Sequence, residues 1–223
     1  MKIFSLNIWF DDFIKNERAK ILIDYIKNNN FDILCFQEIT KPIISKIYKN
    51  IEKEYPFIHI ELDDNFYGVC IISKNEMKEK NIYLFKNSQM RRSLIYCKID
   101  DVIIGTTHLE SEFNKYNNTK INQFNNSIIL LNKFDKVILI GDTNLQKKDC
   151  TKIKYDNFND AFEKLRLDKN KYTYDGVENP LINNKIRSRI DRAYVKNMEI
   201  LNFDVEKEYI MSDHFGIKLE LKS

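Results

Sequence analysis

Side chains that can bind a metal ion or a phosphate occur where several apolar runs of this sequence stop. Residues 137–140 read as a buried strand and are followed by Gly141-Asp142-Thr143-Asn144. Side chains two residues apart on a strand point to the same side, so Asp142 and Asn144 are predicted to converge on one small target. Taken alone, these residues fit equally well an Asx-rich turn, in which Asp and Asn hydrogen-bond their own backbone.

Four further apolar runs end in the same kind of polar residue. Each delivers an Asn, Glu, His or Asp at the point where hydrophobicity stops, and the runs are residues 3–7, 33–38, 102–108 and 211–214. A rigid sheet assembles a catalytic site by carrying its residues at the ends of several strands. Five such ends therefore predict a pocket rather than a set of unrelated turns.

Three of these residues suit a divalent metal ion. Glu38, Asp213 and Asn7 offer hard oxygen ligands. Mg²⁺ prefers a few carboxylates and keeps several of its waters, so we expect Mg²⁺ here, with Mn²⁺ as a substitute. The cation would polarise a phosphoryl oxygen.

The remaining residues suit acid–base and electrostatic roles in hydrolysis. Asp142, held by Asn144, is predicted to orient a water molecule and remove its proton for in-line attack on phosphorus. His108 and His214 are predicted to donate hydrogen bonds to the charge that builds on the phosphoryl oxygens. Asp191 is predicted to hold His214 in the required tautomer and orientation.

The composition bounds these predictions. At 223 residues with 43% hydrophobic residues and no linker-like run, the chain is expected to form one domain over residues 1–223. A net charge of +3 gives only a weak overall field, so local basic clusters matter more. Two clusters flank the predicted pocket, and a solvated face is the ordinary explanation for each: Lys147, Lys148, Lys152 and Lys154, then Arg187, Arg189 and Arg192.

The cysteines and the N-terminus bear on the compartment. Four cysteines are widely spaced without a C-x-x-C pair, and three lie in apolar strand-like runs, which predicts a reduced, intracellular protein of the nucleus or the cytoplasm. The first apolar run is too short for a signal peptide and is broken by Asp11 and Asp12. No stretch approaches the roughly 18 apolar residues of a membrane helix, so no membrane contact is expected. His59, on an apolar segment, is interpreted as a core residue.

The elements that must position these residues follow a clear order. Strand and helix alternate at first, with a helix over residues 12–30, a strand over 31–36 and a helix over 41–53. Five strand-like segments follow without helices between them: 57–61, 66–73, 81–85, 93–99 and 102–107. This change from alternation to hairpins predicts a mixed, largely antiparallel sheet.

The second half of the chain completes a sandwich. A helix is predicted over residues 114–134, leading into the strand at 137, and a short helix over 158–165. Residues 172–187 form a long polar loop, and loops of that length in a compact domain are usually functional or disordered. Closing strands are predicted at 190–195, 200–205 and 215–221. The expected fold is therefore α/β, a two-sheet sandwich with helices on both sides.

Six short motifs, taken in order, resemble the endonuclease/exonuclease/phosphatase superfamily. They are Leu6-Asn7, Gln37-Glu38, Thr107-His108-Leu109-Glu110-Ser111, Gly141-Asp142-Thr143-Asn144, Ile190-Asp191-Arg192 and Ser212-Asp213-His214. Any one of them occurs by chance, but all six in sequence form a specific signal that spans the chain. The resemblance implies the DNase I-like four-layer α/β/β/α sandwich of two mixed sheets, Mg²⁺ dependence and cleavage of a phosphate ester.

Within the superfamily, the sequence is similar to the tyrosyl-DNA phosphodiesterase 2 family. The similarity rests on residues 108–111, 141–145 and 172–175. It implies a role in DNA repair, namely hydrolysis of the bond between a protein tyrosine in a topoisomerase II-type adduct and a DNA 5′ end, leaving a 5′ phosphate. The implied partner is a single-stranded or frayed DNA end, although an RNA end is conceivable. A monomer is our default expectation.

The same resemblance assigns the substrate contacts. Tyr174 matches an aromatic residue that lines the groove for the 5′ nucleotide, where Trp is usual, and Leu181 matches an apolar contact in that loop. Gln146 stands where the family typically has Arg, which predicts a weaker grip on the substrate. The full predicted set is Asn7, His108, Leu109, Glu110, Ser111, Asn144, Gln146, Tyr174, Leu181 and Arg189.

Two other functions stay open. Another superfamily activity, such as an abasic-site endonuclease, a deoxyribonuclease or a phosphoinositide phosphatase, would use similar residues. A phenol with a pKa of about 10 leaves more easily than a sugar hydroxyl, but the leaving group alone does not decide. A catalytically inactive nucleic-acid-binding module would be expected to lose one of Glu38, Asp142, Asp213 or His214, and none is lost.

Overall fold

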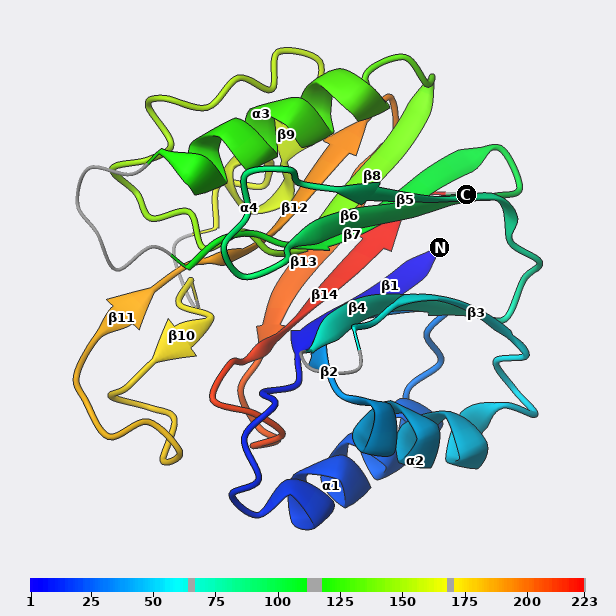
Figure 1. The fold of residues 1–223 in the computed structure, drawn as a ribbon, viewed down its shortest axis with the longest axis vertical. Coiled ribbons are helices and arrows are strands. Elements are labelled where there is room, and N and C mark those ends of the chain that lie inside the picture. The colour runs from blue at the N-terminus through cyan, green and yellow to red at the C-terminus, as the bar shows by residue number, and fades with distance from the viewer. Residues whose placement is uncertain (64–66, 112–117, 168–170, 223) are drawn as a thin grey trace.

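Two six-stranded sheets face each other, and helices cover the outer face of each (Figure 1). The computed structural model describes residues 1–63, 67–111, 118–167 and 171–222. This arrangement is the predicted four-layer sandwich, so the predicted fold class is confirmed.

The first sheet joins both ends of the chain. Its strand order is β13 (Ile200–Glu206), β14 (Gly216–Leu221), β1 (Lys2–Asn7), β2 (Ile33–Ile39), β4 (Gly68–Ser73) and β3 (Phe57–Glu61). Only β1 and β2 are parallel among these neighbours. Helices α1 (Lys15–Asn28) and α2 (Lys41–Ile51) cover its outer face (Figure 1).

The second sheet comes from the middle of the chain. Its strand order is β5 (Lys78–Leu84), β6 (Ser93–Ile99), β7 (Val102–His108), β8 (Lys136–Asp142), β12 (Asp191–Lys196) and β9 (Asn159–Asp160). Only β7 and β8 are parallel among these neighbours. Helix α3 (Thr119–Leu131) covers its outer face, and α4 (Ala161–Lys164) follows β9 (Figure 1).

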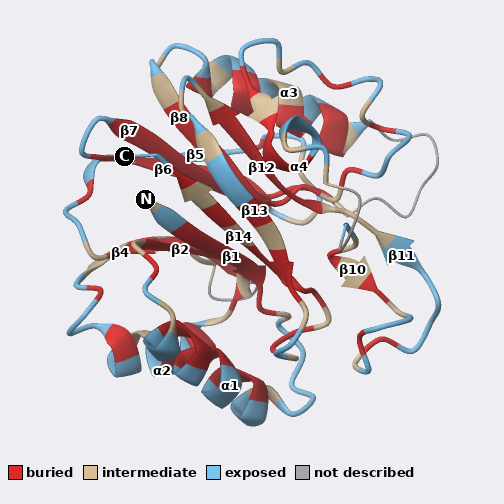
Figure 2. Ribbon diagram, turned by 180° about the vertical axis from the view of Figure 1, so that it is seen from behind, coloured by how far each residue is buried: buried red, intermediate tan, exposed pale blue. Residues whose placement is uncertain are grey.

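Alternating side chains on the central strands fill three apolar layers. On β1, Ile3 faces the opposite sheet while Phe4 packs toward α1, and on β8, Ile138 faces the opposite sheet while Leu139 packs toward α3. Strands buried on both faces are apolar without interruption, which is why these runs stood out in the sequence. Each fully buried Ile or Leu side chain contributes about 1.5–3 kcal/mol. Figure 2 shows these strands buried, whereas α1 and α2 keep an exposed face.

Each sheet contains one parallel pair whose strands are linked through a helix. The chain runs β1-α1-β2 in the first sheet and β7-α3-β8 in the second. Asn7 at the end of β1 contacts Asp142 at the end of β8, so the carboxyl ends of both pairs lie at the same end of the sandwich. In α/β sheets this is the end at which ligands bind.

Several predicted boundaries differ from the structure. The helix predicted over 12–30 begins only at Lys15, because Ile14 has φ 41° and ends a loop that starts after β1. The predicted helix over 114–134 is α3, and its proposed first residues partly lie outside the described ranges. The short helix predicted over 158–165 is instead β9 followed by α4, where the Asp160 side chain caps the helix. The long loop contains a small hairpin, β10 (Tyr174–Asp175) and β11 (Arg187–Ser188).

One predicted strand end is wrong. Residues 211–214 do not end a strand but lie in the connection between β13 and β14. This connection still reaches the site, since Tyr174 of the hairpin forms a bridge with His214. His59 is buried and its Nε2 lies 2.9 Å from the Asn81 carbonyl oxygen, as expected of a core residue. No helix in the described ranges is long and apolar enough to cross a membrane.

Candidate active site

Four of the predicted residues meet at the carboxyl ends of the two parallel pairs. The Nδ2 group of Asn7 donates to Asp142 Oδ2 at 3.0 Å across the two sheets. His108 Nε2 lies 3.2 Å from Asp142 Oδ2 and 3.8 Å from Glu38 Oε1. Residues separated by up to 135 positions therefore share one contact network.

Asp142 is the centre of this network. It is 1% exposed, and its carboxylate accepts hydrogen bonds from Asn7, from His108 and from the backbone N–H of Asn144. Burial by itself raises the pKa of Asp142, but the interactions with His108, His214 and Asn7 outweigh burial and hold its pKa well below the usual value. The side chain is therefore an ionised acceptor, suited to orienting a water molecule.

The backbone around Asp142 is constrained because strand β7 lies close to Gly141. Gly141 has φ 146°, and a Cβ there would overlap the Thr107 carbonyl oxygen, so only glycine fits. Strand β8 ends at Asp142, and Asn144 has φ 51°. Its N–H donates to Asp142 Oδ1 at 2.9 Å, and its Nδ2 donates to the Leu109 carbonyl at 3.0 Å. The prediction that strand alternation brings the two side chains together is thus wrong, and the Asx-turn alternative describes the geometry.

His214 and Asp191 form a buried pair beside Asp142. His214 Nδ1 lies 2.9 Å from Asp191 Oδ2, and His214 Nε2 lies 3.9 Å from Asp142 Oδ2. Asp191 is the first residue of β12 and stands opposite Asp142 in the strand register. Burial disfavours the imidazolium, but the charge of Asp191 and its hydrogen bond outweigh burial and raise the pKa of His214.

His108 has a different partner. Arg92 Nη1 donates to His108 Nδ1 at 2.8 Å, and because arginine has no acceptor, Nε2 must carry the imidazole proton. The Arg92 guanidinium lies 5.0 Å from the centroid of the Tyr67 ring, and the Tyr67 and His108 rings are 5.9 Å apart. Sequence reasoning missed Arg92 and Tyr67. Only the Arg91-Arg92 pair was visible in the sequence, and such pairs usually lie on solvated surface.

Sequence reasoning also missed Thr173. Its Oγ1 accepts the backbone N–H groups of Ile190 and Asp191 at 3.1 and 3.0 Å, and its carbonyl accepts the N–H of Phe215 at 2.7 Å. One residue thus joins the segments that carry Asp191 and His214. Its place in the 172–175 run was the only signal.

Glu38 and Asp213 fit a divalent cation. Glu38 Oε2 accepts the N–H of Phe10 at 3.2 Å, and Glu38 has φ 55°. Burial raises the pKa of Asp213, the charge of His214 opposes this, and the negative charges of Glu38 and Asp142 add to it. A cation would offset this concentration of carboxylates, and hard oxygen ligands suit Mg²⁺. The Asn7 Oδ1 atom, the third predicted ligand, accepts the Trp9 N–H at 3.0 Å.

A second group of ligand atoms is also close together. Atoms of Asp142, Asp191 and His214 lie within 4.8 Å of one another. These atoms are engaged with hydrogen-bond partners, because Asp191 holds His214 Nδ1 and Asp142 accepts three donors. Imidazole is also a poor ligand for Mg²⁺. The pair Glu38 and Asp213 therefore fits the cation better.

Two predicted substrate contacts lie behind the site. Leu109 is 0% exposed and packs in the layer under α3. Glu110 is 4% exposed, and its two oxygens accept from the N–H groups of Gln89 and Met90 and from the side chains of Ser88 and Gln123. The Leu109 side chain therefore belongs to the core under α3, and the Glu110 side chain holds the connection between β5 and β6; neither faces a ligand. Ser111 is half-buried, with Oγ 3.4 Å from the Met90 sulfur.

The other predicted contacts are spread along the rim. The Tyr174 ring lies edge-on to His214, with 5.5 Å between centroids. Leu181 is half-buried in the loop of the β10–β11 hairpin, and Gln146 is exposed. Arg189 does not present its guanidinium to a substrate, because the guanidinium binds both oxygens of Asp160 at 2.9 Å.

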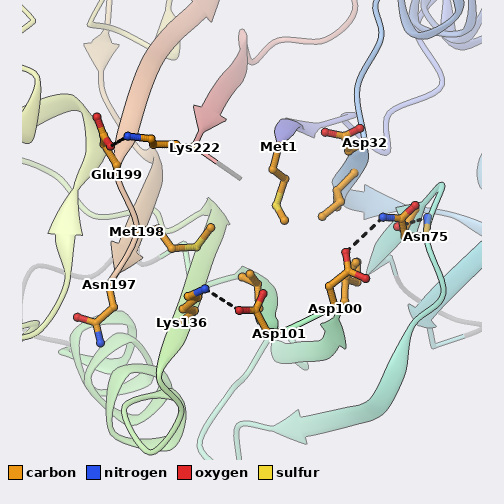
Figure 3. Close-up of a pocket in the computed structure, with 14 residues that line it drawn as sticks. Met1, Asp32, Asn75, Asp100, Asp101, Lys136, Asn197, Met198, Glu199 and Lys222 are labelled. Atoms are coloured by element: carbon orange, nitrogen blue, oxygen red, sulfur yellow. Dashed lines mark hydrogen bonds and ion pairs between the residues drawn. The ribbon is translucent and has the colours of Figure 1, made fainter.

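One cleft lined by described residues lies away from these side chains. It measures about 450 Å³ and lies at the opposite end of the sandwich, where Met1 precedes β1 and Lys136 starts β8 (Figure 3). Its two lysines are paired with carboxylates of the same cleft, Lys136 with Asp101 and Lys222 with Glu199. None of the predicted site residues lines it.

Comparisons with known proteins agree with this geometry. The sequence pattern of the endonuclease/exonuclease/phosphatase family matches residues 4–214. Zebrafish (D. rerio) TDP2, solved with a single-strand DNA product, superposes with a TM-score of 0.90 at 21% identity, covering 100% of this chain and 99% of that one. Truncated Caenorhabditis elegans TDP2 gives 0.88 at 24% identity, covering 100% and 97%. Staphylococcus aureus beta toxin gives 0.79 at 21% identity, covering 100% of both chains.

No match was found among curated proteins. At these identities the solved structures establish the fold. The family match covers most of the chain and includes every residue that meets around Asp142. The chain therefore belongs to the endonuclease/exonuclease/phosphatase family.

Proposed function

We propose that this protein is a Mg²⁺-dependent phosphodiesterase that hydrolyses the bond between a protein tyrosine and a DNA 5′ phosphate. The substrate would be a topoisomerase II-type adduct, and the DNA product would keep its 5′ phosphate. The observation that carries the proposal is the ionised Asp142 between two histidines, with an aromatic ring beside each histidine. The fold shared with TDP2, which has been solved with a single-strand DNA product, supports this substrate class.

The chain's own residues can carry the chemical step. Asp142 accepts a hydrogen bond from a water molecule and takes its proton as the water oxygen attacks phosphorus. The Nε2–H groups of His108 and His214 donate to the phosphoryl oxygens as their charge grows. The bond from phosphorus to the tyrosine oxygen breaks, and the phenolate leaves without a strong general acid, because its pKa is about 10.

The cation would be held by Glu38 and Asp213. When bound there, Mg²⁺ supplies positive charge that stabilises the phosphoryl oxygens in the transition state. Asn7 fixes the position of Asp142 through its amide, so the carboxylate that orients water keeps its place beside the metal ligands.

The DNA strand would lie along the flank that carries the β10–β11 hairpin. Tyr174 presents a ring beside His214, and base stacking on such a ring is worth about 1–3 kcal/mol per base. The connection after β8 adds four lysines within residues 146–154. Positive charge on this connection would attract the phosphates of a single strand.

The decisive experiment uses a 5′-phosphotyrosyl single-stranded oligonucleotide, with Mg²⁺ and with EDTA, beside an abasic-site duplex. Metal-dependent release of a 5′-phosphate end from the tyrosyl substrate alone is the expected result. Cleavage of the abasic duplex alone would assign the protein to another activity of the family. An intact tyrosyl substrate in the presence of Mg²⁺ would refute the proposal.

A further inference from the structure

An exposed apolar surface begins at the active site and runs along the connection between β1 and α1. Phe10, Phe13 and Ile14 are 45%, 58% and 43% exposed. We call residues 10–14 the β1–α1 patch. Exposed large apolar side chains that cluster in this way mark interaction surfaces.

The patch is built on a rigid loop. Arg18 of α1 is 2% exposed, and its guanidinium donates to the carbonyl oxygens of Ile8, Trp9, Asp11 and Phe13 at 2.5–3.1 Å. Trp9 and Ile14 adopt left-handed backbone angles, φ 58° and 41°, which are rare for bulky and β-branched residues. Such strain persists only where the surroundings fix it, so the loop is preorganised rather than collapsed onto the core.

Phe10 connects the patch to the reacting groups. Its backbone N–H donates to Glu38 at 3.2 Å, and its ring stacks on Tyr67 with 4.7 Å between centroids. Tyr67 in turn lies 5.9 Å from the His108 ring. A chain leaving the site on the His108 side therefore meets Phe10 first and then Phe13 and Ile14.

The charge of the β1–α1 patch is opposite to that of the lysine-rich segment after β8. Residues 10–18 carry three carboxylates and two cations; the ammonium of Lys15 pairs with Asp12 at 2.6 Å, and the Arg18 guanidinium is buried under the loop. Residues 146–154 carry four lysines and one aspartate. The two segments lie on different sides of the end of the sandwich that holds the site (Figure 1). A phosphate backbone is repelled by the first segment and attracted by the second.

We propose that the β1–α1 patch binds the polypeptide that is attached to the substrate tyrosine. The inference rests on the proposed function, in which one substituent of the phosphate is a nucleotide and the other is a protein side chain. The lysine-rich segment 146–154 suits nucleic acid. The apolar and acidic β1–α1 patch therefore suits the polypeptide. The patch recognises an extended segment with apolar side chains next to basic ones, so a longer adduct binds better than tyrosine alone.

The sequence supplies a direct reporter for this binding. Trp9 is the one tryptophan of the chain and lies at the start of the loop, next to Phe10. Titration with a free, tryptophan-free peptide of the form Leu-Lys-Tyr-Leu-Lys should therefore change the intrinsic fluorescence in a saturable way. The same peptide with Glu in place of Lys should bind at least severalfold more weakly. Binding measured in this way does not depend on turnover.

Turnover gives the second readout. We expect a KM about tenfold lower for an oligonucleotide carrying this peptide at its 5′ end than for one carrying tyrosine alone, since two apolar side chains become partly buried. The double variant Phe13→Ser with Ile14→Asn should lose most of that preference and keep its activity on the tyrosyl substrate. Asn tolerates the left-handed angle at position 14. Ile129→Ser is the matched control, because Ile129 is 73% exposed on α3.

The outcomes separate the two proposals. Equal KM values for both substrates, with no fluorescence response to the peptide, would overturn the patch and leave the proposed function intact. Failure to cleave either substrate would overturn the proposed function and, with it, this role for the patch. If the Trp9 fluorescence changes with protein concentration when no peptide is present, a second copy of the chain covers the patch, and the proposal is overturned.

Discussion

Two histidines approach the same carboxylate oxygen, but the fold gives them opposite partners. His108 Nε2 and His214 Nε2 lie 3.2 and 3.9 Å from Asp142 Oδ2. Behind them, His108 Nδ1 accepts from the cation of Arg92, whereas His214 Nδ1 faces the anion of Asp191. The group on Nδ1 sets what the Nε2–H can do for a phosphate.

The difference assigns separate tasks to one residue type. With Arg92 on Nδ1, His108 accepts there and donates from Nε2, and a fixed positive charge lies behind it on the guanidinium. With Asp191 on Nδ1, the pKa of His214 is raised and the imidazolium itself carries the charge. A phosphoryl group between them would thus meet a donor backed by a guanidinium on one side and a donor backed by a carboxylate on the other.

Removing the shared carboxylate should have the largest effect. Asp142→Asn keeps the shape but cannot take a proton from water, and we expect kcat to fall about a thousandfold. Steady-state kinetics on the 5′-phosphotyrosyl oligonucleotide measures this loss, and circular dichroism checks that the variant is folded. Full activity of this variant would remove Asp142 from its role and make the comparison of the histidines irrelevant.

Replacing each histidine by glutamine tests the asymmetry directly. Glutamine retains a neutral N–H donor, so His108→Gln should cost about tenfold in kcat. His214→Gln also removes a positive charge, so it should cost about a hundredfold to a thousandfold, the range seen when a transition-state donor is lost. Equal losses in the two variants would contradict the assignment of a cationic role to His214.

A smaller effect is expected when only the partner of His214 changes. Burial alone lowers the pKa of His214, and Asp191 raises it, so Asp191→Asn should shift the pKa of His214 downward. Activity that needs the imidazolium is present below this pKa and lost as the pH rises through it. The variant should therefore lose activity at a lower pH than the wild type, with kcat about tenfold lower at neutral pH.

The pH profile of kcat distinguishes this from a simple loss of packing. A merely structural role for Asp191 would lower the rate at every pH without moving the alkaline limb. Arg92→Met is the matched control on the other histidine, and its alkaline limb should stay where it is in the wild type.

The strand ends that carry the site were predictable because apolar runs stop abruptly there. Asn7, His108 and Asp142 are the last residues of strands buried on both faces, and Glu38 is the last but one of another; such strands read as uninterrupted apolar segments. The sandwich itself was predictable for the same reason. The turn after Asp142 was not predictable, because a left-handed Asn144 and an Asx turn replace the expected alternation.

Contacts made behind the histidines could not be predicted from spacing. Arg92 is 16 residues from His108, and Thr173 is 18 residues from Asp191, and both pairs meet only after the sheets form. Arg189 shows the converse, since its position suggested a substrate contact but its guanidinium is taken up by Asp160. A charged side chain in the sequence does not reveal whether its partner is a ligand or a neighbour in the fold.

The smallest expected effect is at a residue outside the histidine pair. It tests whether substrate affinity is independent of the charges on the two histidines. Gln146 is exposed at the start of the lysine-rich segment, where the family resemblance predicts an arginine. Gln146→Arg should lower KM by a few fold, because an exposed cation beside a phosphate contributes at most about 1 kcal/mol in solvent. The kcat value and its pH profile should be unchanged, since neither His108 nor His214 gains or loses a partner. A KM that falls at low salt and returns to the wild-type value at high salt would identify the gain as electrostatic. A change in kcat would instead mean that residue 146 reaches the reacting phosphate. It would then share with His108 and His214 the task of stabilising the charge on that phosphate.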